Sequence, residues 1–165
     1  MRLAIIADIH DNLVNLEKCL TWCRQNNLQK LICLGDITTS ETLNFLATNF
    51  PGEIFLVSGN GELYSENELS AYPNIHFHKT TGEIYENNLK IGFVHEKRRL
   101  AKLDQNTKNK FNFLFYGHSH QPWLEKNGST TIANPGNLAG IFYQATFAIL
   151  ETGSQKLELK ILANL

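Results

Sequence analysis

The chain has 165 residues, of which 42% are hydrophobic and 19% are charged, a composition typical of a soluble globular protein. This length suits one domain, residues 1–165, that can bury a substantial core. Fifteen Lys and Arg residues against sixteen Asp and Glu residues leave a formal net charge of −1, which argues against a broad footprint for nucleic acid or an anionic membrane.

The first half of the chain alternates short apolar strands with amphipathic helices. Strands are expected at Leu3 to Ala7, Leu31 to Leu34 and Ile54 to Val57. The first helix begins at a cap provided by Asp11 or Asn12, and the second begins at a cap provided by Ser40. This βαβαβ order favours a parallel sheet with helices packed outside it.

The second half is richer in strands and tight turns. One further strand is expected at Phe111 to Tyr116, and hairpins are expected at Thr81 to Tyr85 with Leu89 to Val94, at Pro122 to Glu125 with Thr130 to Ala133, and at Phe142 to Ile149 with Leu157 to Ile161. His76 and His78 alternate on an expected edge strand and are predicted to face solvent. The polar segment from Glu96 to Lys110 is expected to form a short helix or a lid.

Cysteine usage and the N-terminal sequence indicate a cytoplasmic protein. Cys19, Cys23 and Cys33 are odd in number and form no C-x-x-C pair, so buried thiols in a reducing compartment are expected. The N-terminus lacks a signal-peptide pattern, and no apolar run approaches the roughly 20 residues of a membrane span. The sequence does not determine the oligomeric state, and a homo-oligomer is compatible with it.

Side chains that can bind a metal follow the expected core strands. Because ligands bind outside the carboxyl ends of strands in open α/β sheets, donors scattered along the chain can converge there. The donors are Asp8, His10, Asp36, Asn60, His95, His118 and His120. Taken singly, a Gly-Asp or Gly-Asn pair is more often a turn, and two alternating histidines are as often exposed imidazoles as ligands. Their order and shared position after strands favour a metal site.

The ordered set resembles the signature of the calcineurin-like metallophosphoesterase superfamily, and in particular its small phosphodiesterase branch. The signature has the form D-x-H, G-D, G-N, H and G-H-x-H. Here it is Asp8-Ile9-His10, Gly35-Asp36, Gly59-Asn60, His95 and Gly117-His118-Ser119-His120. The resemblance implies an α/β fold of four layers, an αββα sandwich of two mixed sheets flanked by helices, with the site at one edge.

The resemblance also implies a role for each donor. Asp36 would bridge two divalent ions, with Asp8, His10 and His120 on one ion and Asn60, His95 and His118 on the other. Asp36, Asn60 and His95 would be catalytic, and Asn12 and Asn60 would bind the substrate. Two such ions, about 3.5–4 Å apart, lower the pKa of a shared water toward ~7 and so supply hydroxide for attack on phosphorus.

The donor chemistry limits the metal without selecting one. Mixed nitrogen and oxygen ligands without thiolate favour Mn²⁺, Fe²⁺, Zn²⁺, Co²⁺ or Ni²⁺ over Ca²⁺. Manganese is the first prediction for both positions, with iron, zinc, cobalt and nickel as alternatives.

Two departures from the family pattern bear on the reaction. Many members have a histidine after the Gly-Asn pair as a candidate general acid, whereas this chain has Gly61, which cannot donate a proton from a side chain. Glu62 is the candidate for proton transfer in its place. The family usually has glycine after its fourth ligand, whereas His95 is followed here by the anionic Glu96.

These residues together predict a metal-dependent hydrolase that acts on a small phosphodiester or another phosphorylated substrate. The alternative is a metal-binding scaffold of the same fold, like the eukaryotic retromer subunit, with vestigial catalysis. A nuclease is disfavoured because the sequence has neither the additional nucleic-acid-binding domains nor the excess of basic residues that such enzymes use. Lys97, Arg98 and Arg99 form either a solvated turn or a patch that attracts phosphate. Trp22 and Trp123 are expected in the core or at a rim rather than as platforms for stacked bases, because no basic cluster surrounds them.

Overall fold

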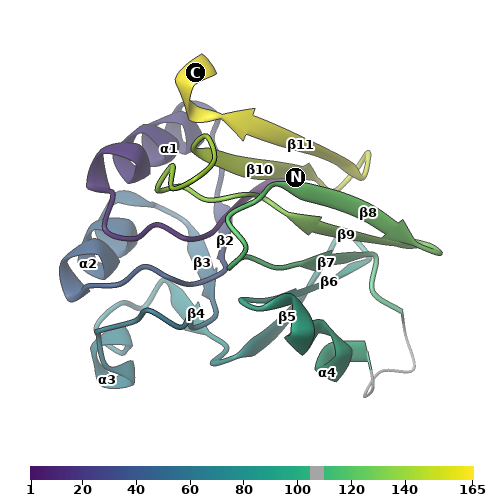
Figure 1. The fold of residues 1–165 in the computed structure, drawn as a ribbon, viewed down its shortest axis with the longest axis horizontal. Helices are drawn as coiled ribbons and strands as arrows, with labels where there is room; N and C mark the ends of the chain where they lie inside the picture. The colour runs from purple at the N-terminus through teal and green to yellow at the C-terminus, as the bar shows by residue number, and fades with distance from the viewer. Residues whose placement is uncertain (105–109) are drawn as a thin grey trace.

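The computed structural model describes residues 1–104 and 110–165, which form two β-sheets packed face to face with helices outside (Figure 1). The first sheet has the strand order β11-β10-β1-β2-β3-β4. Its strands are β1 (Arg2–Ile6), β2 (Lys30–Cys33), β3 (Glu53–Leu56), β4 (Ile75–Phe77), β10 (Thr146–Glu151) and β11 (Lys156–Ile161). Strands β1 to β4 run parallel, and β10 and β11 add an antiparallel hairpin beside β1, so the sheet is mixed.

The second sheet has the strand order β5-β6-β7-β9-β8. Its strands are β5 (Thr81–Glu86), β6 (Leu89–Val94), β7 (Phe113–Phe115), β8 (Trp123–Asn127) and β9 (Thr130–Asn134). The central strands β6, β7 and β9 are parallel, whereas β5 and β8 are antiparallel edge strands. Both sheets are therefore mixed, as the family resemblance implied.

The helices cover the two outer faces. Helices α1 (Leu13–Gln25) and α2 (Ser40–Asn49) lie on the first sheet, and a short 3₁₀ turn (Lys97–Arg99) leads into α4 (Leu100–Asp104) near the second (Figure 1). The remaining short elements are α3 (Glu66–Leu69) and a 3₁₀ turn at Leu162–Asn164. Among the described residues, no helix has the length and apolar character needed to span a membrane.

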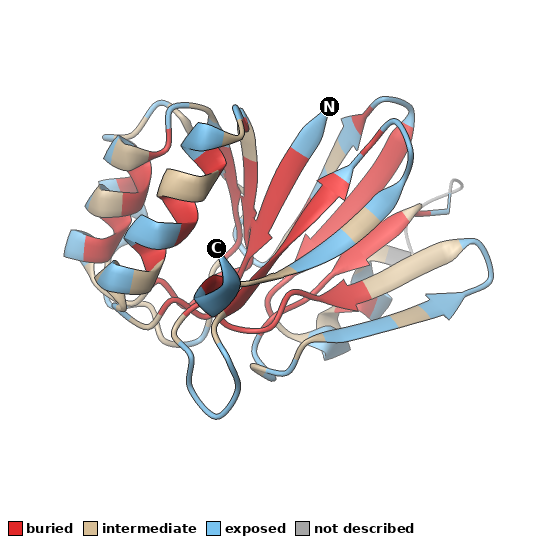
Figure 2. Cartoon of the chain, turned by 90° about the horizontal axis from the view of Figure 1, so that it is seen from above, coloured by how far each residue is buried: buried red, intermediate tan, exposed pale blue. Residues whose placement is uncertain are grey.

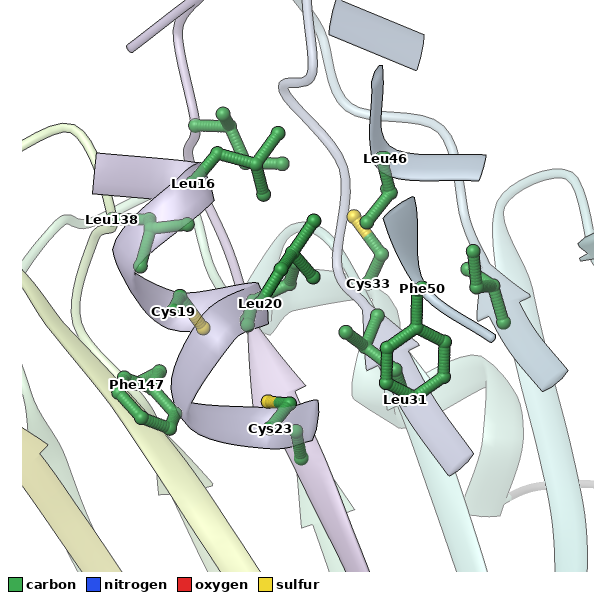
Figure 3. Close-up of a cluster of buried hydrophobic side chains, with 14 of the residues drawn as sticks. Leu16, Cys19, Leu20, Cys23, Leu31, Cys33, Leu46, Phe50, Leu138 and Phe147 are labelled. Carbon is green, nitrogen blue, oxygen red and sulfur yellow. The ribbon is translucent and has the colours of Figure 1, made fainter. Parts of the chain in front are cut away.

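Three buried clusters account for the layers. The first joins α1 and α2 to the outer face of the first sheet through Leu16, Leu20, Leu31, Leu46 and Phe50 (Figure 3). The second fills the space between the sheets, and the third lies between α4 and the second sheet. The central strands are accordingly coloured as buried along most of their length in Figure 2. The predicted four-layer sandwich of two mixed sheets is confirmed, although its outermost layer is a single short helix.

The helix starts show how local chemistry sets the element boundaries. Asn12 caps α1, because its side-chain oxygen accepts a hydrogen bond from the Asn15 N–H at 3.1 Å. The other predicted cap, Asp11, instead accepts hydrogen bonds from Thr39 and Thr42 at the start of α2. Thr39, one residue before the predicted Ser40, is the cap of α2.

The hairpin turn between β5 and β6 follows its sequence. Asn87 and Asn88 both have positive φ, 49° and 64°, which matches the two-residue turn that joins antiparallel strands. The hairpins β8–β9 and β10–β11 also form where turn residues separate the expected strands.

Two local predictions are wrong. The last hairpin begins at Thr146, and Phe142 lies before it with φ 64° and 90% of its surface exposed. His76, on the edge strand β4, is exposed as predicted, but His78, one residue after that strand, is half-buried and its ring packs against Phe93 at 5.2 Å between centroids. The segment from Glu96 to Lys110 includes α4, and its residues 105–109 lie outside the described residues.

Candidate metal centre

The ends of five parallel strands bring the predicted donors together. Strands β1, β2 and β3 of the first sheet and β6 and β7 of the second each lead into a loop that carries at least one of them. These loops are tied by backbone hydrogen bonds: the Asp8 N–H donates to the Gly35 carbonyl at 3.1 Å, and the Gly117 N–H donates to the His95 carbonyl at 2.8 Å. The site is therefore part of the backbone framework of the sandwich.

The donors form two adjacent groups whose ligand atoms lie within 4.8 Å of one another in each group. The first group is Asp8, His10 and His120, and the second is Asp36, His95 and His118. In the first group the Nε2 atoms of the two histidines are 3.1 Å apart. In the second group His95 Nε2 lies 3.2 Å from His118 Nδ1 and 2.9 Å from the Asn60 Oδ1 atom. The grouping matches the ligand sets that the family resemblance implied.

Asp36 lies between the two groups. Its Oδ2 atom is 3.7 Å from His10 Nε2 in the first group and 3.5 Å from His95 Nε2 in the second. Its Oδ1 atom accepts hydrogen bonds from the N–H groups of Asn60 and Gly61, both at 2.8 Å. One oxygen is thus held by the backbone, while the other faces both groups, which is the placement required of a bridging carboxylate.

Hydrogen bonds orient further donors. The Nδ1 atom of His95 lies 2.8 Å from the Leu34 carbonyl oxygen, so Nδ1 carries the proton and Nε2 presents its lone pair to the site. Both carboxylate oxygens of Asp8 accept the His118 N–H, at 3.1 and 3.0 Å. Burial lowers the pKa of His95, which favours the neutral imidazole that a metal requires.

The buried charge at this site fits divalent cations. The side chains of Asp8 and Asp36 are almost completely buried, and within residues 1–104 and 110–165 no lysine or arginine forms an ion pair with either one. Burial raises the pKa of Asp8 to about 8, and the neighbouring Asp36 carboxylate adds to the rise. Because buried carboxylates are normally paired or bound to metals, this donor set suits two cations.

The backbone at the donors is unusual. Asp8, His10, Asp36, His118 and His120 all have positive φ, between 44° and 67°, a region that non-glycine residues seldom adopt. Such residues cluster at functional sites, where the surrounding structure holds them in place. The strand-end loops turn within one or two residues and so aim each side chain into a shared space.

The glycines of the pairs Gly35-Asp36 and Gly59-Asn60 have a steric cause in this structure. A Cβ atom on Gly35 would collide with the backbone of Gly59, and one on Gly59 would collide with Asp36. The loops after β2 and β3 therefore lie so close together that neither glycine position has room for a Cβ atom. This close approach lets the Asn60 N–H donate to Asp36 Oδ1.

The remaining predicted site residues lie around the two groups. Asn12 is next to the first group, but its amide nitrogen donates to the Ala139 carbonyl at 3.0 Å while its oxygen caps α1. Glu62 accepts the Gly59 N–H and the Thr38 N–H, each at 3.0 Å and each on a different oxygen. Glu62 therefore joins the loops after β2 and β3.

Glu96 is paired with cations rather than directed at the ligands. Its carboxylate lies 2.6 Å from Arg98 Nε and 3.1 Å from Arg99 Nε. These ion pairs lower the pKa of Glu96, with the Arg98 hydrogen bond as the largest cause. Together with Lys97 and Arg98 it lines a cavity of about 510 Å³ that reaches Asn60 and His118. Two arginines share one carboxylate here, so this side of the site keeps positive charge.

Two asparagines to which the sequence analysis gave no role hold the loop of His118 and His120. The amide of Asn134 donates to the Gly117 carbonyl at 3.0 Å and to Ser119 Oγ at 2.9 Å, and that of Asn137 donates to the His120 carbonyl at 3.0 Å. Both asparagines are buried. In the sequence, the only sign of this role is that the two asparagines flank the Pro135-Gly136 turn.

Comparisons with known proteins show the family of this chain. Residues 1–155 match the model of the calcineurin-like phosphoesterase superfamily domain. The phosphodiesterase YfcE of Escherichia coli K12 is 26% identical over 152 residues, which cover 84% of this chain and 80% of YfcE.

Solved structures share the whole fold. An archaeal phosphodiesterase superposes with a TM-score of 0.84 at 20% identity, covering 98% of this chain and 99% of its own. Vps29 of Entamoeba histolytica, solved with zinc, superposes with a TM-score of 0.69 at 21% identity and with the same two coverages. Because the family model covers nearly the entire chain, the protein belongs to the calcineurin-like phosphoesterase superfamily.

Proposed function

We propose that the protein hydrolyses phosphodiesters with the help of two divalent metal ions. The observation that carries the proposal is the position of Asp36, whose Oδ2 atom lies within 3.7 Å of a histidine from each of two separate donor groups. Similarity to YfcE, a phosphodiesterase, supports the same reaction class. The scaffold alternative is disfavoured because both donor groups are complete, although Vps29 shares the fold.

The residues divide the work as follows. One ion would be held by Asp8, His10 and His120. The other ion would be held by Asn60, His95 and His118, and Asp36 would bind both ions. When bound, two such ions polarise a phosphate and acidify a water for attack on phosphorus. Asn60 and Asn12 would orient the substrate phosphate, and His95, held through Leu34, would keep its place beside Asn60.

We prefer diesters to monoesters as substrates because position 61 has no side chain that could protonate a leaving group. Monoester hydrolysis gains most from such an acid when the leaving alkoxide is poor. Gly61 instead contributes a backbone N–H that binds Asp36 at 2.8 Å.

We propose that Glu62 orders the metal loops and is not the acid, since both its oxygens already accept backbone hydrogen bonds. In a Glu62→Gln variant one backbone N–H would face an amide NH₂, so metal affinity should fall several-fold while the pH–rate profile keeps its shape. Metal titration and a pH series of the rate check this. If the variant instead lost one limb of the pH–rate profile and kept its metal affinity, Glu62 would be a proton-transfer residue.

Manganese is our first choice for the metal and the cytoplasm for the location, supported by the mixed N/O donors and by three buried free thiols. Metal analysis of protein purified without chelators tests the first, and fluorescence microscopy of a tagged chain tests the second. Zinc or iron as the bound metal would replace manganese without altering the ligand assignment.

The central experiment combines metal removal with an isosteric substitution. Chelator-treated protein should be inactive on bis-p-nitrophenyl phosphate and should regain activity with Mn²⁺. The Asp36→Asn variant should lose at least ~100-fold in kcat/KM and bind fewer than two Mn²⁺ per chain, because the amide carries no charge to share between ions. Glu158→Gln, an equivalent change on the exposed edge strand β11, is the control. A wild-type protein that binds two Mn²⁺ and stays inert on diesters and monoesters alike would defeat the proposal.

A further inference from the structure

A second cavity, of about 380 Å³, lies next to the metal centre on the other side of His118. It shares Lys97 and His118 with the basic cavity beside Asn60. A phosphate at the donor groups therefore has two neighbouring spaces for its substituents. This volume is at the lower end of the range of roughly 300–1,000 Å³ found for small-molecule sites.

The walls of this second cavity are aromatic and polar. Trp123 and Glu125 alternate on the edge strand β8, so both side chains point to the same face of the sheet. The Trp123 Nε1–H donates to Glu125 Oε2 at 3.1 Å, which fixes the indole, yet half of the Trp123 surface is exposed. Tyr116 forms the floor, and its ring lies 5.2 Å from Lys97 Nζ.

The charges in this cavity cancel. Lys97 Nζ forms an ion pair with Glu125 Oε1 at 2.8 Å. The basic cavity differs, because Lys97 and Arg98 line it together with the single carboxylate of Glu96, which also pairs with Arg99. A second anionic group thus suits the basic cavity, whereas a neutral planar group suits the aromatic one, with Gln121 and Ser119 as further hydrogen-bonding groups at the wall.

We propose that the cavity walled by Trp123, Tyr116 and Glu125 binds a nucleobase, so that the substrates are phosphodiesters of nucleosides. The inference rests on the proposed diesterase function. An indole that is half exposed and held by a hydrogen bond offers a face on which any base can stack, and stacking tolerates different bases. Lys97, Glu125 and Gln121 supply donors and acceptors for the edge of the base.

Hydrolysis of two substrates gives the first test. The Mn²⁺-loaded protein is assayed on the p-nitrophenyl ester of thymidine monophosphate and on methyl p-nitrophenyl phosphate, which has the same leaving group but no base. The quantity compared is kcat/KM for the nucleoside ester divided by kcat/KM for the other substrate. In the Trp123→Leu variant this ratio should fall about ten-fold, as expected for the loss of one stacked base. Trp123→Phe should restore most of the ratio, and Trp22→Phe, on α1, serves as the matched control. A ratio that does not move in Trp123→Leu overturns the proposal while leaving diester hydrolysis in place.

A binding measurement separates this proposal from the proposed function. In a Trp22→Phe background Trp123 is the one tryptophan left in the chain, so its fluorescence reports on this cavity. Adenosine monophosphate should quench it at concentrations at which glycerol phosphate does not. Quenching in a protein that hydrolyses no diester supports the base site although the function has failed. Equal responses to the two phosphates would show recognition of the anion alone and would overturn the base site.

Discussion

At the scale of single residues, the metal donors depend on backbone conformations that are costly elsewhere. Five of the seven donors have positive φ. A conformation of this kind costs on the order of 1–3 kcal/mol per residue and persists only where the surroundings hold it. Backbone hydrogen bonds between strand-end loops, such as Asp8 N–H to Gly35 carbonyl, provide that hold. The fold itself therefore holds these side chains in place.

The sequence indicated all seven candidate donors, because each follows an expected strand and most belong to a short motif. It could not show which motifs approach each other closely, as Gly35 and Gly59 do, since that contact joins loops 24 residues apart. The sequence selected Glu62 as a residue near the site, with proton transfer as its candidate role. The hydrogen bonds that it accepts from Gly59 and Thr38 depend on the fold and could not be predicted.

Gly61 permits a gain-of-function prediction. Its φ is not in the left-handed region, and a Cβ atom there would lie 3.4 Å or more from its nearest neighbours, all atoms of the Asp36 carboxylate. A side chain therefore fits. In Gly61→His the imidazole would lie beside Asp36 as a candidate acid, so hydrolysis of phosphomonoesters should rise about ten-fold or more relative to diesters.

The measurement is the ratio of kcat/KM for glycerol phosphate, a monoester whose leaving alkoxide is poor, to that for bis-p-nitrophenyl phosphate, whose leaving group needs no acid. Gly61→Leu, which brings bulk without a proton donor, is the control. If both variants shift the ratio equally, the effect is steric and position 61 does not control the choice of substrate.

At the scale of elements, the strands were predicted best where burial and turn chemistry agree. The hairpin β5–β6 formed as expected because Asn87 and Asn88 both tolerate positive φ. The last hairpin was placed too early because Phe142 continues the apolar pattern of β10, although it is 90% exposed, with its ring 6.2 Å from that of His120. Helix α3 was not predicted, since its four residues are too few for a helical period.

His78 after strand β4 yields a pH prediction. Its Nε2 atom is buried without a hydrogen-bond partner, and burial lowers the pKa of the imidazole below its ordinary value of 6.5. The folded protein therefore binds fewer protons there than the unfolded chain. The stability from neutral His78 is fully present above pH about 6.5 and is lost as the pH falls toward the lower folded pKa.

The difference between wild type and His78→Leu isolates this contribution. The Tm of the Mn²⁺-loaded wild type should fall more between pH 7 and pH 5 than that of His78→Leu. His76→Leu, on the exposed side of the same edge, controls for loss of a neighbouring histidine. Parallel Tm curves for wild type and His78→Leu would show that the ring gains its proton without leaving its place against Phe93.

At the scale of the whole molecule, the site depends on the packing of two sheets against each other. Three strands of one sheet and two of the other deliver the ligands, so their relative position sets every distance between the donor groups. Phe115 lies in the cluster between the sheets, is completely buried, and belongs to the strand that leads to His118.

Phe115→Ala should therefore cost about 3–5 kcal/mol of unfolding free energy, the usual cost of a cavity left by a buried phenylalanine. Urea denaturation of the metal-free protein measures it. The same change at exposed Phe142 should cost no more than about 0.5 kcal/mol. Similar losses at the two positions would mean that the two sheets do not share a tightly packed interior.

The sequence by itself predicted the order of the strands along the chain and the candidate metal donors, because apolar runs, turn residues and donor motifs are local signals, and through the family resemblance it predicted the class of fold. Only the tertiary structure decided that Asp36 lies between two groups, that Glu96 is paired with Arg98 and Arg99, and that Trp123 borders a cavity beside His118. These contacts join residues from separate loops and strands. They follow from how buried faces pack, a property of the whole chain that no local pattern encodes.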